Sequence, residues 1–138
     1  MEIIRILAKI IIMANSEKYN FVELVGALKS SFEQSVVWHH QTDSYAMHKA
    51  LNNFYDEIVG LVDGLVESVS GIYNRPEGYE LESPVDYKNP EQVNKYFKSC
   101  YDMIQRDRKE IYQETWIQNQ VDEIAQLFAE TLYLLSLK

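Results

Sequence analysis

The sequence is poor in cysteine. Its 138 residues contain a single one, Cys100. One cysteine cannot form an internal disulfide, so we expect a chain that folds in a reducing, cytoplasmic setting. Cys100 falls on the same predicted helical stripe as Phe97 and Ile104, which indicates a buried thiol and not a nucleophile.

Basic residues are also few. Thirteen Lys and Arg residues stand against 21 Asp and Glu residues, giving a formal net charge of −8 at pH 7. Proteins that bind a phosphate backbone need clustered lysine and arginine, so this charge disfavours nucleic-acid binding. The same negative charge favours the approach of cations.

The chain lacks the motifs of several enzyme classes. It has no glycine-rich phosphate loop, no Cys-x-x-Cys pair and no Gly-x-Ser-x-Gly elbow. No apolar run approaches the about 20 residues of a transmembrane helix. Any chemistry is therefore expected from histidine and carboxylate side chains.

The length and composition are those of one globular domain. With 46% apolar residues, the chain is long enough to bury a substantial core. We expect residues 19–138 to form an all-α four-helix domain, preceded at residues 1–18 by an N-terminal extension or short amphipathic helix. For residues 1–13 three readings stay open: packing on a neighbouring subunit, translation upstream of a start at Met13, or attachment to a membrane surface.

Capping signals and apolar spacing predict the first two helices. Asn20 with Glu23 three residues later reads as a capping box, so the first main helix is expected to begin at Asn20. A short turn follows the His39-His40 pair. A second, long helix is predicted from about Ser44 to Gly71.

The third and fourth helices are predicted in the same way. Asn89, Pro90 and Gln92 combine an N-cap, a first-turn proline and a capping-box glutamine. Thr115, with Gln118 three residues later, is the expected cap of the fourth helix. The acidic connection at residues 73–88 could span about 50 Å when extended, enough to run back along a helix.

The metal-capable side chains lie on and before the second helix. They are His39 or His40, then His48, Asp63 and Glu67. His48 and Asp63 are about 22 Å apart along a helix axis, so one ion cannot touch both in one chain.

Two copies of this helix could complete a site between them. If they cross antiparallel about a twofold axis between Glu57 and Ile58, paired positions sum to 115. His48 then faces the partner's Glu67, and Asn52 faces the partner's Asp63.

Two glycines support a close approach at this axis. Gly60 and Gly64 lie inside the predicted helix, where each costs about 1 kcal/mol relative to alanine. Close packing of a second helix would compensate, with Tyr55 over the partner's Gly60. The second helix also carries two apolar stripes, which again indicates a subunit interface.

The stretch His-His-Gln-Thr-Asp-Ser-Tyr-Ala-Met-His-Lys-Ala-Leu, residues 39–51, is followed at residues 54–67 by Phe-Tyr-Asp-Glu-Ile-Val-Gly-Leu-Val-Asp-Gly-Leu-Val-Glu. This pattern resembles the mini-ferritins of the Dps family, closest to the short versions encoded in bacteriophage genomes. The resemblance covers roughly residues 20–137. It implies a ferritin-like four-helix bundle with a long crossover between the second and third helices, in the cytoplasm of a bacterial or phage-infected cell.

The resemblance also implies a metal site shared by two subunits. Its ligands would be His39, His48, Asn52, Asp63 and Glu67. The sequence departs from the family pattern in three ways: Asn52 stands where an aspartate is expected, the segment between the first two histidines is shorter and leaves His39 and His40 both open, and a lysine-rich tail is absent.

The implied function is binding of ferrous iron, its oxidation by peroxide or oxygen, and storage of ferric iron, which would make the protein a ferroxidase. Ligand chemistry alone also admits zinc or manganese. The expected assembly is a dimer through the second helix, or a dodecamer built from such dimers. The alternative is a non-catalytic ferritin-like oligomeric scaffold or interaction protein of phage origin with a degenerate metal site.

Overall fold

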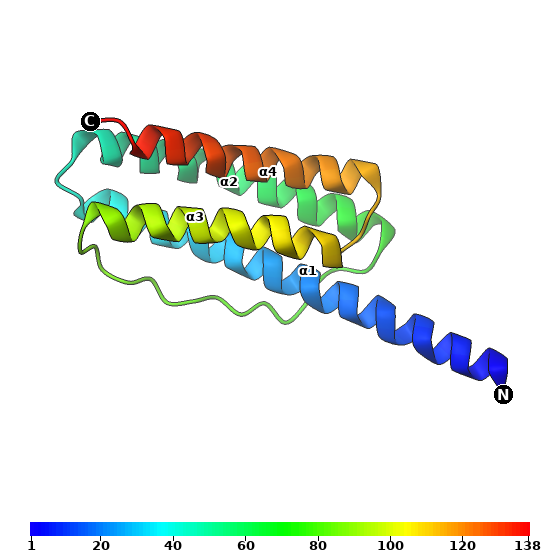
Figure 1. The fold of residues 1–138 in the computed structure, drawn as a ribbon. Coiled ribbons are helices and arrows are strands. Elements are labelled where there is room, and N and C mark those ends of the chain that lie inside the picture. The colour runs from blue at the N-terminus through cyan, green and yellow to red at the C-terminus, as the bar shows by residue number, and fades with distance from the viewer.

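The computed structural model describes residues 1–138 and is entirely helical, which confirms the predicted all-α class. Four α-helices lie side by side over most of their length (Figure 1). A short 3₁₀ turn, η1, follows α3. The elements are α1 (Glu2–Gln41), α2 (Tyr45–Ile72), α3 (Pro90–Asp107), η1 (Arg108–Glu110) and α4 (Thr115–Leu135).

Helix α1 is one uninterrupted helix of 40 residues. The capping box predicted at Asn20 and Glu23 is wrong, because both residues lie inside this helix. Asn20 Nδ2 donates to the Glu110 carbonyl at 3.2 Å, and Glu23 accepts a hydrogen bond from the Tyr19 hydroxyl at 2.9 Å. No glycine or proline precedes Gly26, so no residue favours a break, and the predicted boundary between residues 18 and 19 falls within α1.

The predicted starts of α2 and α3 are confirmed. The Ser44 side chain accepts a hydrogen bond from the Met47 backbone N–H at 3.2 Å and caps α2. Asn89 accepts from the Gln92 N–H at 2.8 Å, and Pro90 opens α3. Both caps satisfy N–H groups that a helix end leaves without partners.

Helix α4 begins at Thr115, but the predicted cap is wrong. Glu114 occupies the N-cap position, and no side chain caps this end. The Gln118 side chain instead donates to the backbone carbonyls of Arg108 and Tyr112 at 3.0 and 2.9 Å. Gln118 therefore joins α4 to the preceding turn.

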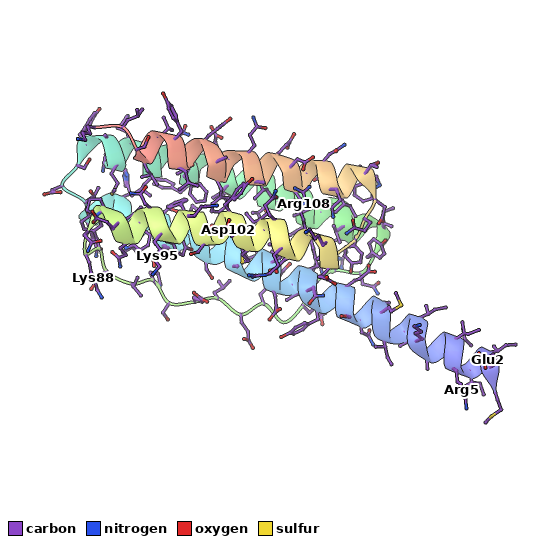
Figure 2. All side chains as sticks on the ribbon, in the orientation of Figure 1. Glu2, Arg5, Lys88, Lys95, Asp102 and Arg108 are labelled. Atoms are coloured by element: carbon purple, nitrogen blue, oxygen red, sulfur yellow. The ribbon has the colours of Figure 1, made fainter.

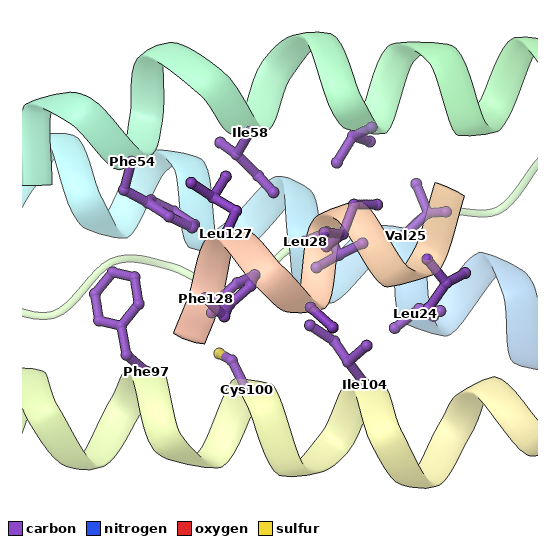
Figure 3. Close-up of a cluster of buried hydrophobic side chains, with 14 of the residues drawn as sticks. Leu24, Val25, Leu28, Phe54, Ile58, Phe97, Cys100, Ile104, Leu127 and Phe128 are labelled. Carbon is purple, nitrogen blue, oxygen red and sulfur yellow. The ribbon is translucent and has the colours of Figure 1, made fainter. Parts of the chain in front are cut away.

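A single apolar core lies between the helices (Figure 3). Helix α2 packs against α1 and α4, and α3 packs against α4. Phe54 of α2 meets Phe97 of α3 and Phe128 of α4 edge-on, with both pairs of ring centroids 4.9 Å apart. The predicted inner faces of α3 and α4 are buried as expected: Val93, Phe97, Cys100 and Ile104 on α3, and Ile117, Val121, Ile124, Phe128, Thr131 and Leu135 on α4.

Residues 74–89, which we call the strap, connect α2 to α3 without helix or strand and run back along α1 (Figure 1). Polar side chains of α1 bond the strap backbone. The Gln34 amide pairs with both the N–H and the C=O of Val85, each at 2.9 Å. The Ser30 hydroxyl accepts from the Glu82 N–H at 2.9 Å. These bonds satisfy backbone groups that an extended segment would otherwise leave unpaired.

A glycine lets the strap lie close to α1. A Cβ atom at Gly26 would lie 2.8 Å from the Glu80 backbone oxygen. Farther along, Gln41 accepts a hydrogen bond from the Tyr87 N–H at 2.7 Å. The strap is thus fixed to α1 over most of its length.

The first residues of α1 project beyond the other helices (Figure 1). We call residues 1–16 the N-terminal arm, and every one of them is exposed. Figure 2 shows Glu2 and Arg5 near its free end, far from the other helices. None of the protein's helices has the length and apolar character needed to cross a membrane. The exposed large apolar residues of the arm, beyond Met1, are Ile3, Ile4, Ile6, Leu7, Ile10, Ile11, Ile12 and Met13.

Candidate metal centre

Two histidines face each other where α1 ends and α2 begins. The chain reverses at residues 42–44, which brings His39 in the last turn of α1 beside His48 in the first turns of α2. Their imidazole rings stack, with centroids 3.7 Å apart and planes 19° from parallel. His39 is buried and His40 is exposed. The sequence did not decide whether His39 or His40 points inward, and in the structure His39 does.

Each ring is hydrogen-bonded to the backbone of the other residue. His39 Nδ1 lies 2.8 Å from the His48 carbonyl oxygen, and His48 Nδ1 lies 2.9 Å from the His39 carbonyl oxygen. A carbonyl oxygen can only accept, so each Nδ1 carries a proton. In a neutral imidazole the Nε2 atom is then unprotonated and can accept a proton or bind a metal.

Asn52 lies one turn after His48, and its side-chain amide already has two partners. Asn52 Nδ2 donates to the Asp56 carboxylate at 2.7 Å, and Asn52 Oδ1 accepts from the Tyr55 hydroxyl at 3.3 Å. The Tyr55 ring meets the His39 ring edge-on, with centroids 5.2 Å apart. A small polar network therefore extends from the imidazole pair along α2.

Apolar spacing predicts Tyr55 on the same stripe of α2 as His48 and Asn52. Asp56 was not predicted in this group. The signal that could have found it is its spacing, because a residue four positions after Asn52 lies on the same helix face.

Asp63 and Glu67 lie farther along α2, and both are exposed. Asp63 is about 22 Å from His48 along the helix axis. Within the chain no cluster of three or more His, Cys, Asp or Glu side chains is placed to hold a metal ion. The structure brings His39, His48 and Asn52 together and leaves the two carboxylates apart from them.

The outer face of α2 between these groups is open. A Cβ atom at Gly60 would meet nothing within 4 Å, and one at Gly64 would meet only the Gln120 side-chain oxygen at 3.8 Å. Val59 is 45% exposed. Ile72, the last residue of one of the two apolar stripes predicted for α2, is 66% exposed at the end of the helix.

A groove of about 560 Å³ runs between α1 and α2 beside this open face. Its lining includes the apolar side chains of Phe32, Val59 and Val62 and the carboxylates of Glu33 and Asp63. One of the two carboxylates predicted to bind metal therefore stands at an apolar groove on the surface of the chain.

The thiol of Cys100 takes no part in this arrangement. It lies in the core near Phe97 and Phe128 (Figure 3). Burial raises the pKa of the Cys100 thiol to about 11. The thiol therefore stays protonated at neutral pH, which suits the predicted buried thiol and disfavours a role as a nucleophile.

Similarity to a known protein family covers this region. A family described as a family of unknown function (DUF5856) matches residues 39–135. The chain belongs to this family. The DUF5856 match begins at His39, so it includes the imidazole pair, Asn52, Asp63 and Glu67, and leaves out the N-terminal arm.

A relative of this DUF5856 member is an uncharacterized 14.6 kDa protein in the mobD-ri intergenic region of Enterobacteria phage T4. It is 30% identical over 125 residues, which is 89% of this chain and 91% of the phage protein. No solved structure matches the chain.

Proposed function

We propose that this DUF5856 member is a Dps-like iron-binding protein with a ferritin-like bundle. Its substrate would be ferrous iron, oxidised by peroxide or oxygen and kept as ferric iron. The ligands would be His39, His48 and Asn52 of one chain with the partner's Asp63 and Glu67.

The observation that carries this proposal is the reciprocal bonding of the two histidines. Metal-binding histidines almost always donate their second ring nitrogen to a carbonyl or carboxylate, which fixes the tautomer and the ring. His39 and His48 both do so through Nδ1. Two Nε2 atoms are thus held ready as ligands, and imidazole with carboxylate suits ferrous iron as well as zinc or manganese.

The surface of α2 supports a partner in the predicted position. Gly60 offers a site for close helix approach, and the apolar groove at Phe32, Val59 and Val62 lies beside it. A second α2 crossing there about the predicted twofold axis would cover both, and it would carry the partner's carboxylates toward the imidazole pair.

The course of the chain supports the ferritin-like assignment. The strap between α2 and α3 returns along α1, which is the long crossover that distinguishes such bundles from simple up-and-down ones. The relative from phage T4 is in keeping with the resemblance to short phage-encoded mini-ferritins.

The test is an anaerobic titration of the full chain with ferrous iron, followed by addition of peroxide while ferric absorbance is recorded. We expect the Asp63→Ala/Glu67→Ala variant to lose iron affinity by at least about tenfold, because it removes both carboxylate ligands. The matched control is Glu123→Ala/Glu130→Ala, which removes two exposed carboxylates of α4. Equal iron oxidation in the two double variants would contradict the assigned ligands.

The histidines are tested by a second pair of variants. His48→Gln keeps a side-chain N–H donor but removes the imidazole, whereas His40→Ala removes an exposed imidazole outside the stacked pair. We expect iron binding to fall only in His48→Gln. Circular dichroism of both variants should show the same helix content as the unaltered chain.

One observation favours a second candidate, the non-catalytic scaffold. The amide of Asn52 is already bonded to Asp56 and Tyr55, so a metal ion would compete with the Tyr55 hydroxyl for the Asn52 oxygen. A scaffold would keep the bundle and the α2 contact with no iron uptake. Absence of iron binding in the unaltered chain, with dimers still present by sedimentation, would decide for the scaffold.

A further inference from the structure

The N-terminal arm carries an apolar seam. Ile3, Leu7, Ile10 and Ala14 follow at intervals of four, three and four residues, so they line one side of α1. The three large side chains among them are more than half exposed in the structure. The charged residues of the arm lie around the other side of the helix: Glu2, Arg5 and Lys9.

We propose that this seam binds the same seam of a second copy of the chain, with the two arms antiparallel. About a twofold axis between Ala8 and Lys9, paired positions sum to 17. Ile3 then packs on the partner's Ala14, and Leu7 packs on the partner's Ile10. Every seam position meets an apolar residue, and Glu2, Arg5 and Lys9 stay off the seam.

A hollow at the base of the arm fits the end of a partner arm. It has a volume of about 420 Å³ and lies between the arm and the end of the bundle. Ile10 and Ala14 of the seam line it, together with Tyr73 and Tyr112, whose rings stack with centroids 3.9 Å apart. The seam therefore continues into a hollow of mixed apolar and polar lining at the point where the tip of an antiparallel arm arrives.

Charge does not oppose a second copy. In the same register the partner's Glu2 falls opposite Asn15, near both Glu17 and Lys18, whose opposite charges line the hollow together. A membrane is a poorer partner, because anionic lipid repels a chain of net charge −8 and the arm offers only Arg5 and Lys9 as basic side chains.

Cysteine pairing tests the register. In a Cys100→Ala background, Ile3→Cys/Ala14→Cys places thiols opposite each other, and mild oxidation should link two chains. The control is Arg5→Cys/Ile12→Cys, which also sums to 17 but lies on the outer side of the arms and should stay unlinked. Equal linking of both pairs, or efficient linking of Ile3→Cys alone as in a parallel pair, would overturn the register.

Association of the full chain tests the contact itself. Ile10→Asp puts a charge in the seam, whereas Ile12→Asp makes the same change about 160° around the helix. Sedimentation equilibrium should show at least tenfold weaker association for Ile10→Asp and no loss for Ile12→Asp. This proposal does not rest on iron binding. Gly60→Glu puts a charged side chain on the open face of α2 and blocks the contact proposed there. Comparing Ile10→Asp with Ile12→Asp in the Gly60→Glu variant therefore measures association through the arms alone.

Binding of the arm to lipid vesicles is the result that would contradict this proposal. Flotation with vesicles of phosphatidylcholine and phosphatidylglycerol should leave the unaltered chain unbound. Binding to vesicles that Ile10→Asp abolishes, with no self-association difference between the two aspartate variants, would assign the seam to lipid and overturn the proposal.

Discussion

The bonds between His39 and His48 couple each imidazole to the backbone of the other helix. Removing either ring deletes one side-chain-to-backbone hydrogen bond between the two helices, so the pair also closes the turn between α1 and α2. The resemblance to the mini-ferritins placed His39, His48 and Asn52 in one group of ligands. It could not choose between His39 and His40, because that choice depends on how three turn residues reverse the chain.

The thiol of Cys100 gives a prediction at the same scale. Its pKa rises from 9.0 to about 11 on folding, so the folded state holds the proton more tightly than the unfolded state. The stability this contributes is fully present below pH 9 and is lost as pH rises toward 11, by on the order of 2 kcal/mol. Urea unfolding from pH 8 to pH 11 should show this loss.

Subtracting the same series for Cys100→Ala isolates the contribution of the thiol from that of the other ionisable groups. The unaltered chain should lose more stability with rising pH than the variant does. Parallel curves for the two proteins would show that the thiol is not desolvated in the folded state.

At the scale of elements, the strap depends on side chains that carry no strong sequence signal. The stripes of α3 and α4 and the caps at Ser44 and Asn89 were readable, since each rests on contacts within one helix or on its apolar spacing. Ser30 and Gln34 looked like ordinary polar positions. Their role is visible only once an extended segment 50 residues later lies against them.

Gly26 gives the prediction for this element. Alanine there would place Cβ 2.8 Å from the Glu80 carbonyl oxygen, and a backbone atom cannot yield as a flexible side chain does. We expect Gly26→Ala to destabilise the protein by about 1–3 kcal/mol despite its better helix propensity. Gly71→Ala, where the new methyl meets nothing within 4 Å, should change stability by less than about 1 kcal/mol in the favourable direction.

Chemical denaturation of the two alanine variants measures both values under the same conditions. If Gly26→Ala were as stable as Gly71→Ala, the strap would not be held against α1 as the structure describes.

At the scale of the whole molecule, the proposed metal centre is divided between two chains, and that division can be tested directly. Chains carrying His48→Gln and chains carrying Asp63→Ala/Glu67→Ala each lack one half of every site. In a mixed dimer one site regains both halves and the other loses both. After random subunit exchange in an equal mixture, about half of the dimers are mixed, and each of these has one intact site out of two. We therefore expect the mixture of the two inactive variants to recover up to about a quarter of the iron oxidation of the unaltered chain.

Mixing either variant with itself should recover nothing. Lack of recovery in the mixture, with subunit exchange verified by a fluorescent label, would show that the ligands do not come from two chains. The twofold arrangement could be proposed from sequence because helix geometry fixes which positions are opposite. The uninterrupted course of α1 through Asn20 could not, because the signals at Asn20 and Glu23 favoured a helix start there.

Because α1 is unbroken, its length fixes the distance between the N-terminal arm and the imidazole pair. At 1.5 Å per residue, His39 lies about 46 Å from the axis proposed between Ala8 and Lys9, so two chains joined by their arms would hold their imidazole pairs about 90 Å apart. Neither flexible loop nor hinge separates the two features. The spacing of metal centres across an arm-linked pair is thus set by the length of one helix, and adding or removing a turn within the arm would lengthen or shorten it in steps.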